Sequence, residues 1–259
     1  MWISVGTPAV EFLAGCASLT DRERQIAARL RMPQRRRSFA AGRWLVKRAA
    51  AGLLAGEEHA KPNVPLTERF EVLGEHVGET TSRPVLFLDG LPAGLPISIT
   101  HTDDTVAAAI TDAECGIGID LVEVRGVSPG FQTMWMKKHE RRQVKDSDDP
   151  GLTAAMNWSA REAVFKASES GDAFRPADWS VTLNADQSVC SYRGQIQAAR
   201  FRFFRLANGL LLTVAAQSTN VPDVVFQSPD LSATAAHADI RVACENAESV
   251  TVQLLEQQS

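Results

Sequence analysis

Two long stretches with helical periodicity dominate this sequence, and each is followed by short segments with the alternation of β-strands. The first helix is predicted over 34–56 and the second over 149–170, where Asp149 suits the N-cap and Pro150 the first turn. Strands are predicted at 83–88, 97–101, 106–110, 115–124, 179–183, 195–206 and 210–216. This order predicts an α+β fold of two similar halves, each a long helix packed on a small antiparallel sheet, although no sequence repeat is visible.

The expected boundaries follow from this order. The N-terminal half is predicted over 1–113 and the C-terminal half over 114–219. From 220 to 259 the composition shifts towards Ser, Ala, Asp and Gln, so this segment is expected to be an appendage of unknown role. It contains two further candidate strands, at 239–243 and 249–255.

Composition excludes several classes of protein. The net charge of −4 gives no overall electrostatic case for a nucleic-acid binder. No apolar run approaches the roughly 20 residues of a membrane helix. The four cysteines are spread along the chain without a CxxC pair, so neither a zinc site nor a disulfide framework is expected. A reducing cytoplasm is the expected compartment.

A short acidic pattern in the second half indicates a metal site. Glu162 and Lys166 are four residues apart, so they share one face of the predicted helix. The alternatives are an ordinary surface ion pair, or a capping box in which Ser159 and Glu162 begin a helix. In the strand before this helix, Asp120 follows two alternating glycines, which are expected to leave room for a bulky ligand. Two carboxylates meeting across a strand and a helix suit Mg²⁺.

The first helix carries a basic stripe. Arg36, Arg43 and Lys47 fall on one face, with almost no acid between 34 and 56. A solvated helix face is the alternative, but unpaired charge of this density favours an anionic partner such as phosphate. Together with Arg83, His101 and Lys166, this stripe is expected to surround a polyanion.

Two motifs carry a resemblance to a known family. GIGID at 116–120 and WSAREAVFK at 158–166 resemble the paired signature of the 4′-phosphopantetheinyl transferases, and SRP at 82–84 and SITHT at 98–102 support it. Over about 19–216 the chain is most similar to the larger, pseudo-dimeric type that activates surfactin synthetase. The resemblance implies coenzyme A bound in a cleft between two α+β halves. It also implies transfer of the phosphopantetheine arm to a serine of an apo acyl or peptidyl carrier protein, releasing 3′,5′-ADP.

The resemblance also implies residue roles. Asp120 and Glu162 would hold Mg²⁺, Glu162 would help to deprotonate the serine, and Lys166 would stabilise the leaving phosphate. The residues expected to contact coenzyme A are Arg36, Arg43, Lys47, Arg83, Thr100, His101 and Lys166. One fused chain makes a monomer sufficient.

Two positions depart from the family's pattern. Where many members of the larger type carry a further acid, this chain has Val122, with the acid displaced to Glu123. Because side chains alternate along a strand, Glu123 is expected to point away from the metal. Arg161 replaces a lysine, which keeps the charge but changes the geometry.

The remaining expectations concern partners. The segment 125–145 is predicted to meet an acidic carrier protein, with core packing of its tryptophan as the alternative; its relevant residues are Met134, Trp135, Met136, Lys137, Lys138, Arg141 and Arg142. A catalytically silent relative that binds coenzyme A or a carrier is the alternative function. A nucleic-acid binder that uses the basic helix is a third hypothesis, which the net charge disfavours.

Overall fold

The computed structural model divides the chain into two units, which are described separately. It describes residues 2–55, 69–77, 81–111, 115–168, 173–184, 188–206, 209–217, 225–226, 238–245 and 249–255. Unit 1 comprises Met1–Glu114, Pro222–Pro229 and Ala235–Ser259, and unit 2 comprises Cys115–Val221 and Asp230–Thr234. The break after Glu114 lies one residue from the boundary expected between the halves.

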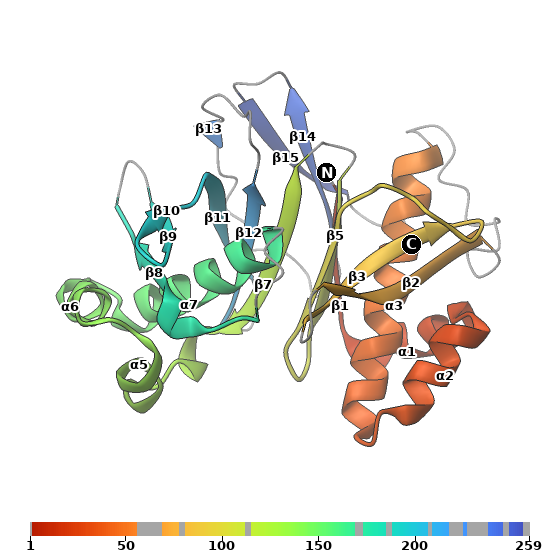
Figure 1. The fold of residues 1–259 in the computed structure, drawn as a ribbon, viewed down its shortest axis with the longest axis horizontal. Coiled ribbons are helices and arrows are strands. Elements are labelled where there is room, and N and C mark those ends of the chain that lie inside the picture. The colour runs from red at the N-terminus through yellow and green to blue at the C-terminus, as the bar shows by residue number, and fades with distance from the viewer. Residues whose placement is uncertain are drawn as a thin grey trace. The chain divides into compact units, whose positions relative to one another are not determined.

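Unit 1 begins with a strand and three helices (Figure 1). These are β1 (Trp2–Gly6), α1 (Pro8–Ser18), α2 (Asp21–Arg29) and α3 (Pro33–Ala55). Five strands follow, namely β2 (Phe70–Val77), β3 (Thr81–Leu88), β4 (Leu91–Pro92), β5 (Ile97–His101) and β6 (Val106–Ile110). The late strands are β13 (Val225–Phe226), β14 (Ala238–Glu245) and β15 (Ser249–Leu255).

The main sheet of unit 1 has the order β13-β15-β14-β1-β6-β5. All neighbours in it are antiparallel except β13 and β15. The long helix α3 packs on β6 and β1, and buries Leu45, Val46 and Ala50 with Val106 and Ile110. A second sheet has the order β2-β3-β4. The segment expected to be an appendage therefore contributes β14 beside β1 in the main sheet of this unit.

Unit 2 repeats the succession of one strand, helices and further strands (Figure 1). It contains β7 (Gly116–Glu123), the short 3₁₀ helix η1 (Val124–Gly126), α5 (Pro129–Trp135), α6 (Lys138–Asp146) and α7 (Pro150–Ala167). After a second 3₁₀ turn, η2 (Pro176–Asp178), come β8 (Trp179–Thr182), β9 (Val189–Tyr192), β10 (Gln195–Ile196), β11 (Ala199–Arg205) and β12 (Leu210–Gln217).

The sheets of unit 2 are both antiparallel. Strands β11-β12-β7 form one and β10-β9-β8 the other. Helix α7 packs on β7 and β12. Asp149 caps α7 by accepting a hydrogen bond from the Leu152 amide at 3.0 Å, as its sequence position predicted.

The structure corrects several expected boundaries. The segment expected to meet a carrier protein forms two short helices, with Ser128 capping α5 at Phe131 N and Glu140 capping α6 at Lys137 N. The single strand expected over 195–206 is interrupted between β10 and β11. Strand β2 was not expected at all. Among the described helices, none has both the length and the apolar character that a bilayer crossing requires.

Candidate active site

The glycines of β7 make room for helix α7. A Cβ built at Gly116 would lie 2.0 Å from the carbonyl oxygen of Ala167. At Gly118 it would lie 1.9 Å from the carbonyl oxygen of Ala163. Both distances are far below any real contact, so α7 occupies the space above these residues. The expectation that the glycines leave room for a bulky ligand is therefore wrong, because the helix backbone itself fills that room.

This close packing brings the three predicted side chains of unit 2 together. Lys166 Nζ donates to Asp120 Oδ1 at 2.8 Å and to the carbonyl oxygen of Ile119 at 3.1 Å. The same ammonium lies 3.5 Å from Glu162 Oε2. Asp120 is almost fully buried, whereas about a quarter of the side chains of Glu162 and Lys166 remains exposed. The Glu162–Lys166 pair is therefore more than a solvated surface contact, although both of its side chains remain partly accessible to solvent.

The electrostatics follow from that crowding. Burial raises the pKa of Glu162, the charge of Asp120 raises it further, and Lys166 only partly offsets both. Burial lowers the pKa of Lys166, but the two carboxylates outweigh burial and raise it above its ordinary value. Lys166 is therefore a permanent cation at neutral pH, held against two acids that repel each other.

Neighbouring polar groups hold the strand and the helix in register. The Ser159 hydroxyl donates to Thr213 Oγ1 at 2.6 Å and also lies 3.4 Å from the carbonyl oxygen of Asp120. Thr213 is the residue of β12 that pairs with Asp120. All three lie in the buried interior. Nothing in the sequence pointed to Thr213, since its partners are distant in the chain.

The site has the chemistry of a hard divalent cation site. Asp120 and Glu162 offer carboxylate oxygens, and their mutual repulsion shows that additional positive charge would stabilise them. Within the described part of the chain, no cluster of three or more His, Cys, Asp or Glu residues suits a metal. Glu123 is exposed and, by strand alternation, lies on the opposite face of β7 from Asp120.

The basic stripe of α3 is not a continuous free surface. Lys47 is completely buried, where its Nζ contacts Glu23 Oε2 at 2.6 Å and the Ser18 carbonyl oxygen at 2.7 Å. The expectation that Lys47 contacts coenzyme A is therefore wrong, because Glu23 neutralises the charge of this lysine inside unit 1. The partner, Glu23, comes from α2, which the charge count within a single helix could not reveal.

Two other arginines of the stripe have backbone partners. Arg43 lies across the ring of Phe39 and donates from Nε to the carbonyl oxygen of Val72 at 3.2 Å. Burial lowers its pKa to about 10. Arg36 is exposed and donates from Nε to the carbonyl oxygen of Leu30 at 2.6 Å.

The other predicted ligands of coenzyme A lie on strands of unit 1. Arg83 is half-buried on β3, opposite Glu75. Thr100 is buried on β5, and the exposed His101 ends that strand, opposite Val106. Asp120, Glu162 and Lys166 belong to unit 2, so the structure brings together one of the two predicted groups of site residues.

Comparison with known proteins finds a family resemblance within unit 2. No curated protein matches the chain. The region from β7 to β12 holds Asp120, Glu162 and Lys166, and it is this region that a family model recognises: residues 116–215 match the 4′-phosphopantetheinyl transferase superfamily.

Proposed function

We propose that this protein transfers the 4′-phosphopantetheine arm of coenzyme A to a serine of an apo acyl or peptidyl carrier protein, with Mg²⁺, and releases 3′,5′-ADP. The observation that carries the proposal is the contact of Lys166 with both Asp120 and Glu162 inside the matched region. Phosphoryl chemistry of this kind depends on neutralised charge more than on a covalent nucleophile.

The reaction forms a bond between the serine oxygen and a phosphorus of the pyrophosphate, and breaks the bond from that phosphorus to the bridging oxygen. Asp120 and Glu162 would hold Mg²⁺, whose charge would polarise the pyrophosphate oxygens. Lys166 is fixed as a cation and neutralises charge on the departing phosphate. Glu162 would take the serine proton, directly or through water.

The residues proposed to contact coenzyme A are those predicted from the sequence, with one exception. Arg83, Thr100 and His101 would contact the 3′-phosphate end, and Arg36 and Arg43 the nucleotide. Lys47 is left out because its ammonium is buried. In both units a strand and then helices, the last of them long, precede further strands, and this shared order supports the larger, two-halved type of enzyme. One chain would then suffice as a monomer.

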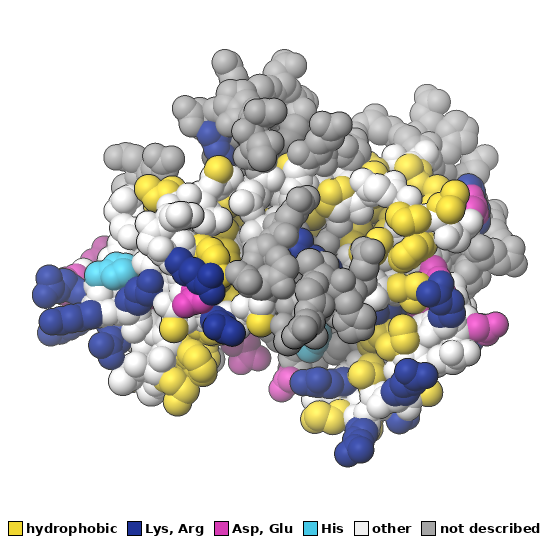
Figure 2. All heavy atoms as spheres, in the orientation of Figure 1, with side chains coloured by type: hydrophobic (Ala, Val, Ile, Leu, Met, Phe, Trp, Pro, Cys, Tyr) yellow, Lys and Arg dark blue, Asp and Glu magenta, His cyan; other side chains and the backbone are white. Residues whose placement is uncertain are grey.

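The surface proposed for the carrier protein is formed by α5 and α6. Met134 and Trp135 are 71% and 38% exposed, so neither side chain packs fully into the core. Lysines and arginines gather over α6, at the left of Figure 2, where Lys138 and Arg142 are exposed. Apolar groups rimmed by cations suit an acidic helix. Reversing the charge of Lys138 and Arg142 is expected to raise the KM for the carrier while leaving that for coenzyme A unchanged; an unchanged carrier KM would refute this surface.

The deciding experiment is the intact mass of an apo carrier protein after incubation with this protein, coenzyme A and Mg²⁺. We expect a gain of one phosphopantetheine group that EDTA prevents, and that Asp120→Ala or Glu162→Ala abolishes without unfolding the protein. If several carriers gain nothing while coenzyme A still binds, the protein is a silent relative. If coenzyme A does not bind either, the assignment of the site is wrong.

A further inference from the structure

A buried ion pair in unit 2 lies directly beside the candidate active site. Glu140 has no exposed surface, and both of its carboxylate oxygens are engaged. Oε1 accepts a hydrogen bond from Val181 N at 2.7 Å, and Oε2 accepts one from Lys137 N at 2.6 Å and another from the guanidinium of Arg161. The same guanidinium donates to the carbonyl oxygen of Trp135 at 2.6 Å. Arg161 thereby joins α7 to the end of α5, the start of α6 and β8.

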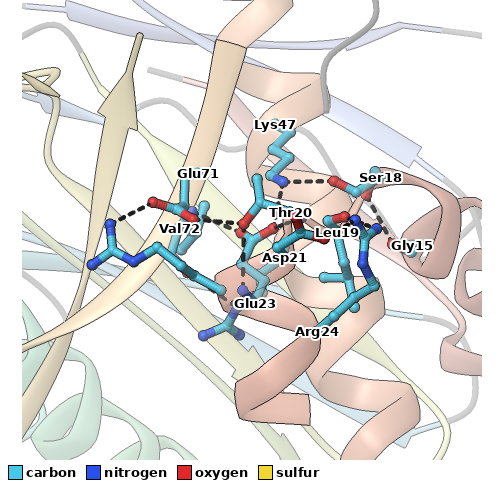
Figure 3. Close-up of polar contacts among 12 residues, drawn as sticks. Gly15, Ser18, Leu19, Thr20, Asp21, Glu23, Arg24, Lys47, Glu71 and Val72 are labelled. Carbon is cyan, nitrogen blue, oxygen red and sulfur yellow. Dashed lines mark hydrogen bonds and ion pairs between the residues drawn. The ribbon is translucent and has the colours of Figure 1, made fainter. Parts of the chain in front are cut away.

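Unit 1 contains the same arrangement with a lysine (Figure 3). Glu23 Oε1 accepts a hydrogen bond from Val72 N at 2.7 Å, and its Oε2 accepts one from Thr20 N at 2.8 Å. Lys47 of the long helix α3 contacts Glu23 Oε2 and donates to the carbonyl oxygen of Ser18. In both units the backbone carbonyl lies five residues before the glutamate. An ammonium can therefore make the two contacts that the guanidinium of Arg161 makes.

The position of Arg161 gives its pair a consequence that the pair in unit 1 lacks. Arg161 immediately precedes Glu162 on α7, about 100° around the helix axis. On the opposite side, α7 rests on Gly116 and Gly118, which have no side chains to interlock with it. Ser159 of α7 contacts Thr213 and the carbonyl oxygen of Asp120, and the polar contacts of Arg161 add a second restraint on the rotation of the helix.

We infer that the Glu140–Arg161 pair is a positioning device that sets the rotation of α7, and hence the approach of Glu162 and Lys166 to Asp120. This inference rests on the proposed transfer reaction for its kinetic consequence only. Two observations specify what the device requires. Lys47 shows that a lysine suffices, and Arg161 Nε is buried without a hydrogen-bond partner, so the full guanidinium fork is not used. The replacement of a family lysine by Arg161 should then be of little consequence.

The chain offers a matched pair of variants. Glu140→Gln and Glu23→Gln each leave one buried cation unpaired, and both should lower stability by similar amounts. Only Glu140→Gln should also lower kcat for transfer, by about 10- to 100-fold, and raise the Mg²⁺ concentration for half-maximal rate. Arg161→Lys should keep a rate close to that of the wild type, whereas Arg161→Met should not. Equal kinetic effects of Glu140→Gln and Glu23→Gln would overturn the inference, because the pair would then be merely structural.

A second variant and a second measurement cover the remaining cases. If Glu140→Gln fails to fold, the double variant Glu140→Gln/Arg161→Met removes both charges and is expected to fold. The ¹⁵N signal of the Lys166 ammonium, measured by NMR, reports its ion pairs independently of any activity. We expect that signal to shift and to exchange faster in the double variant. An unchanged signal would refute the positioning role, and the absence of transfer by the wild type would refute only the proposed reaction.

Discussion

Replacing Gly118 by alanine tests the close packing on which the whole site depends. The new Cβ would lie 1.9 Å from Ala163 O and 2.5 Å from Ala167 N, where ordinary contacts begin near 3.4 Å. Helix α7 would have to retreat by about 1.5 Å, because both obstacles are backbone atoms that cannot swing away. The Lys166–Asp120 hydrogen bond, now 2.8 Å, would then exceed 4 Å by about 0.3 Å and be lost.

The magnitude follows from the same geometry. Overpacking costs about 1–3 kcal/mol, and a clash between backbones should lie at or above the top of that range. Lower entropy of the unfolded chain returns less than about 1 kcal/mol. We therefore expect Gly118→Ala to lose about 2–3 kcal/mol in urea denaturation followed by circular dichroism, and to lose transfer activity even at temperatures where it remains folded.

The control and the refuting result are both available in unit 2. Gly151→Ala in the first turn of α7 places its Cβ 3.6 Å from Asp149 Oδ1, an ordinary contact, so it should leave stability unchanged or slightly raised, with normal activity. If Gly118→Ala keeps the stability of the wild type and loses only binding of coenzyme A, the space above this glycine serves a ligand and is not filled by the backbone of α7.

Three further predictions concern buried charges and thiols. At neutral pH in EDTA, Glu162→Gln should melt at a higher temperature than the wild type, because folding raises the pKa of Glu162 and thus disfavours its charged form. The stability contributed by the neutral carboxyl group is fully present below pH 4.5 and is lost as the pH rises through the folded-state pKa. That difference in melting temperature should vanish near pH 4, and a constant difference across pH would contradict the assignment. Lys47→Met should lower the free energy of unfolding, measured in urea, by about 3–5 kcal/mol because it leaves Glu23 buried and unpaired. If the variant lost binding of coenzyme A without losing stability, Lys47 would be a ligand of coenzyme A as the sequence predicted. Burial raises the pKa of Cys190 to about 12, so its thiol should resist alkylation at pH 8 until urea unfolds the protein, as mass mapping of the alkylated peptides would show.

The site in unit 2 could be predicted because its signals are local. Glu162 and Lys166 share a helix face by spacing alone, and Asp120 follows from the alternation of one strand. The sequence could not predict what packs against each face of the β7 strand. Alternation identified a face stripped of side chains by Gly118, but whether a ligand or a helix fills it depends on tertiary packing.

The prediction for Lys47 failed for the same physical reason. A count of charges along α3 cannot include Glu23, which lies on another helix and reaches Lys47 only in the folded protein. The shape of the guanidinium suggested that Arg161 could not replace a lysine without consequence, but its side chain makes only two polar contacts, with Trp135 O and Glu140. The sequence of a single segment cannot reveal the contacts of a residue whose partner lies in a different helix or strand.

The position of β1 has a practical consequence for shortening this protein. In the sheet order β13-β15-β14-β1-β6-β5, β1 is an interior strand, and its side chains Ile3 and Val5 are buried. Deleting 235–259 would remove β14 and leave one edge of β1 with unpaired backbone amides and carbonyls. An apolar strand with an open edge recruits strands from other molecules. Although the polar composition of 235–259 suggests that it is dispensable, the protein without this segment should precipitate or form strand-exchanged oligomers.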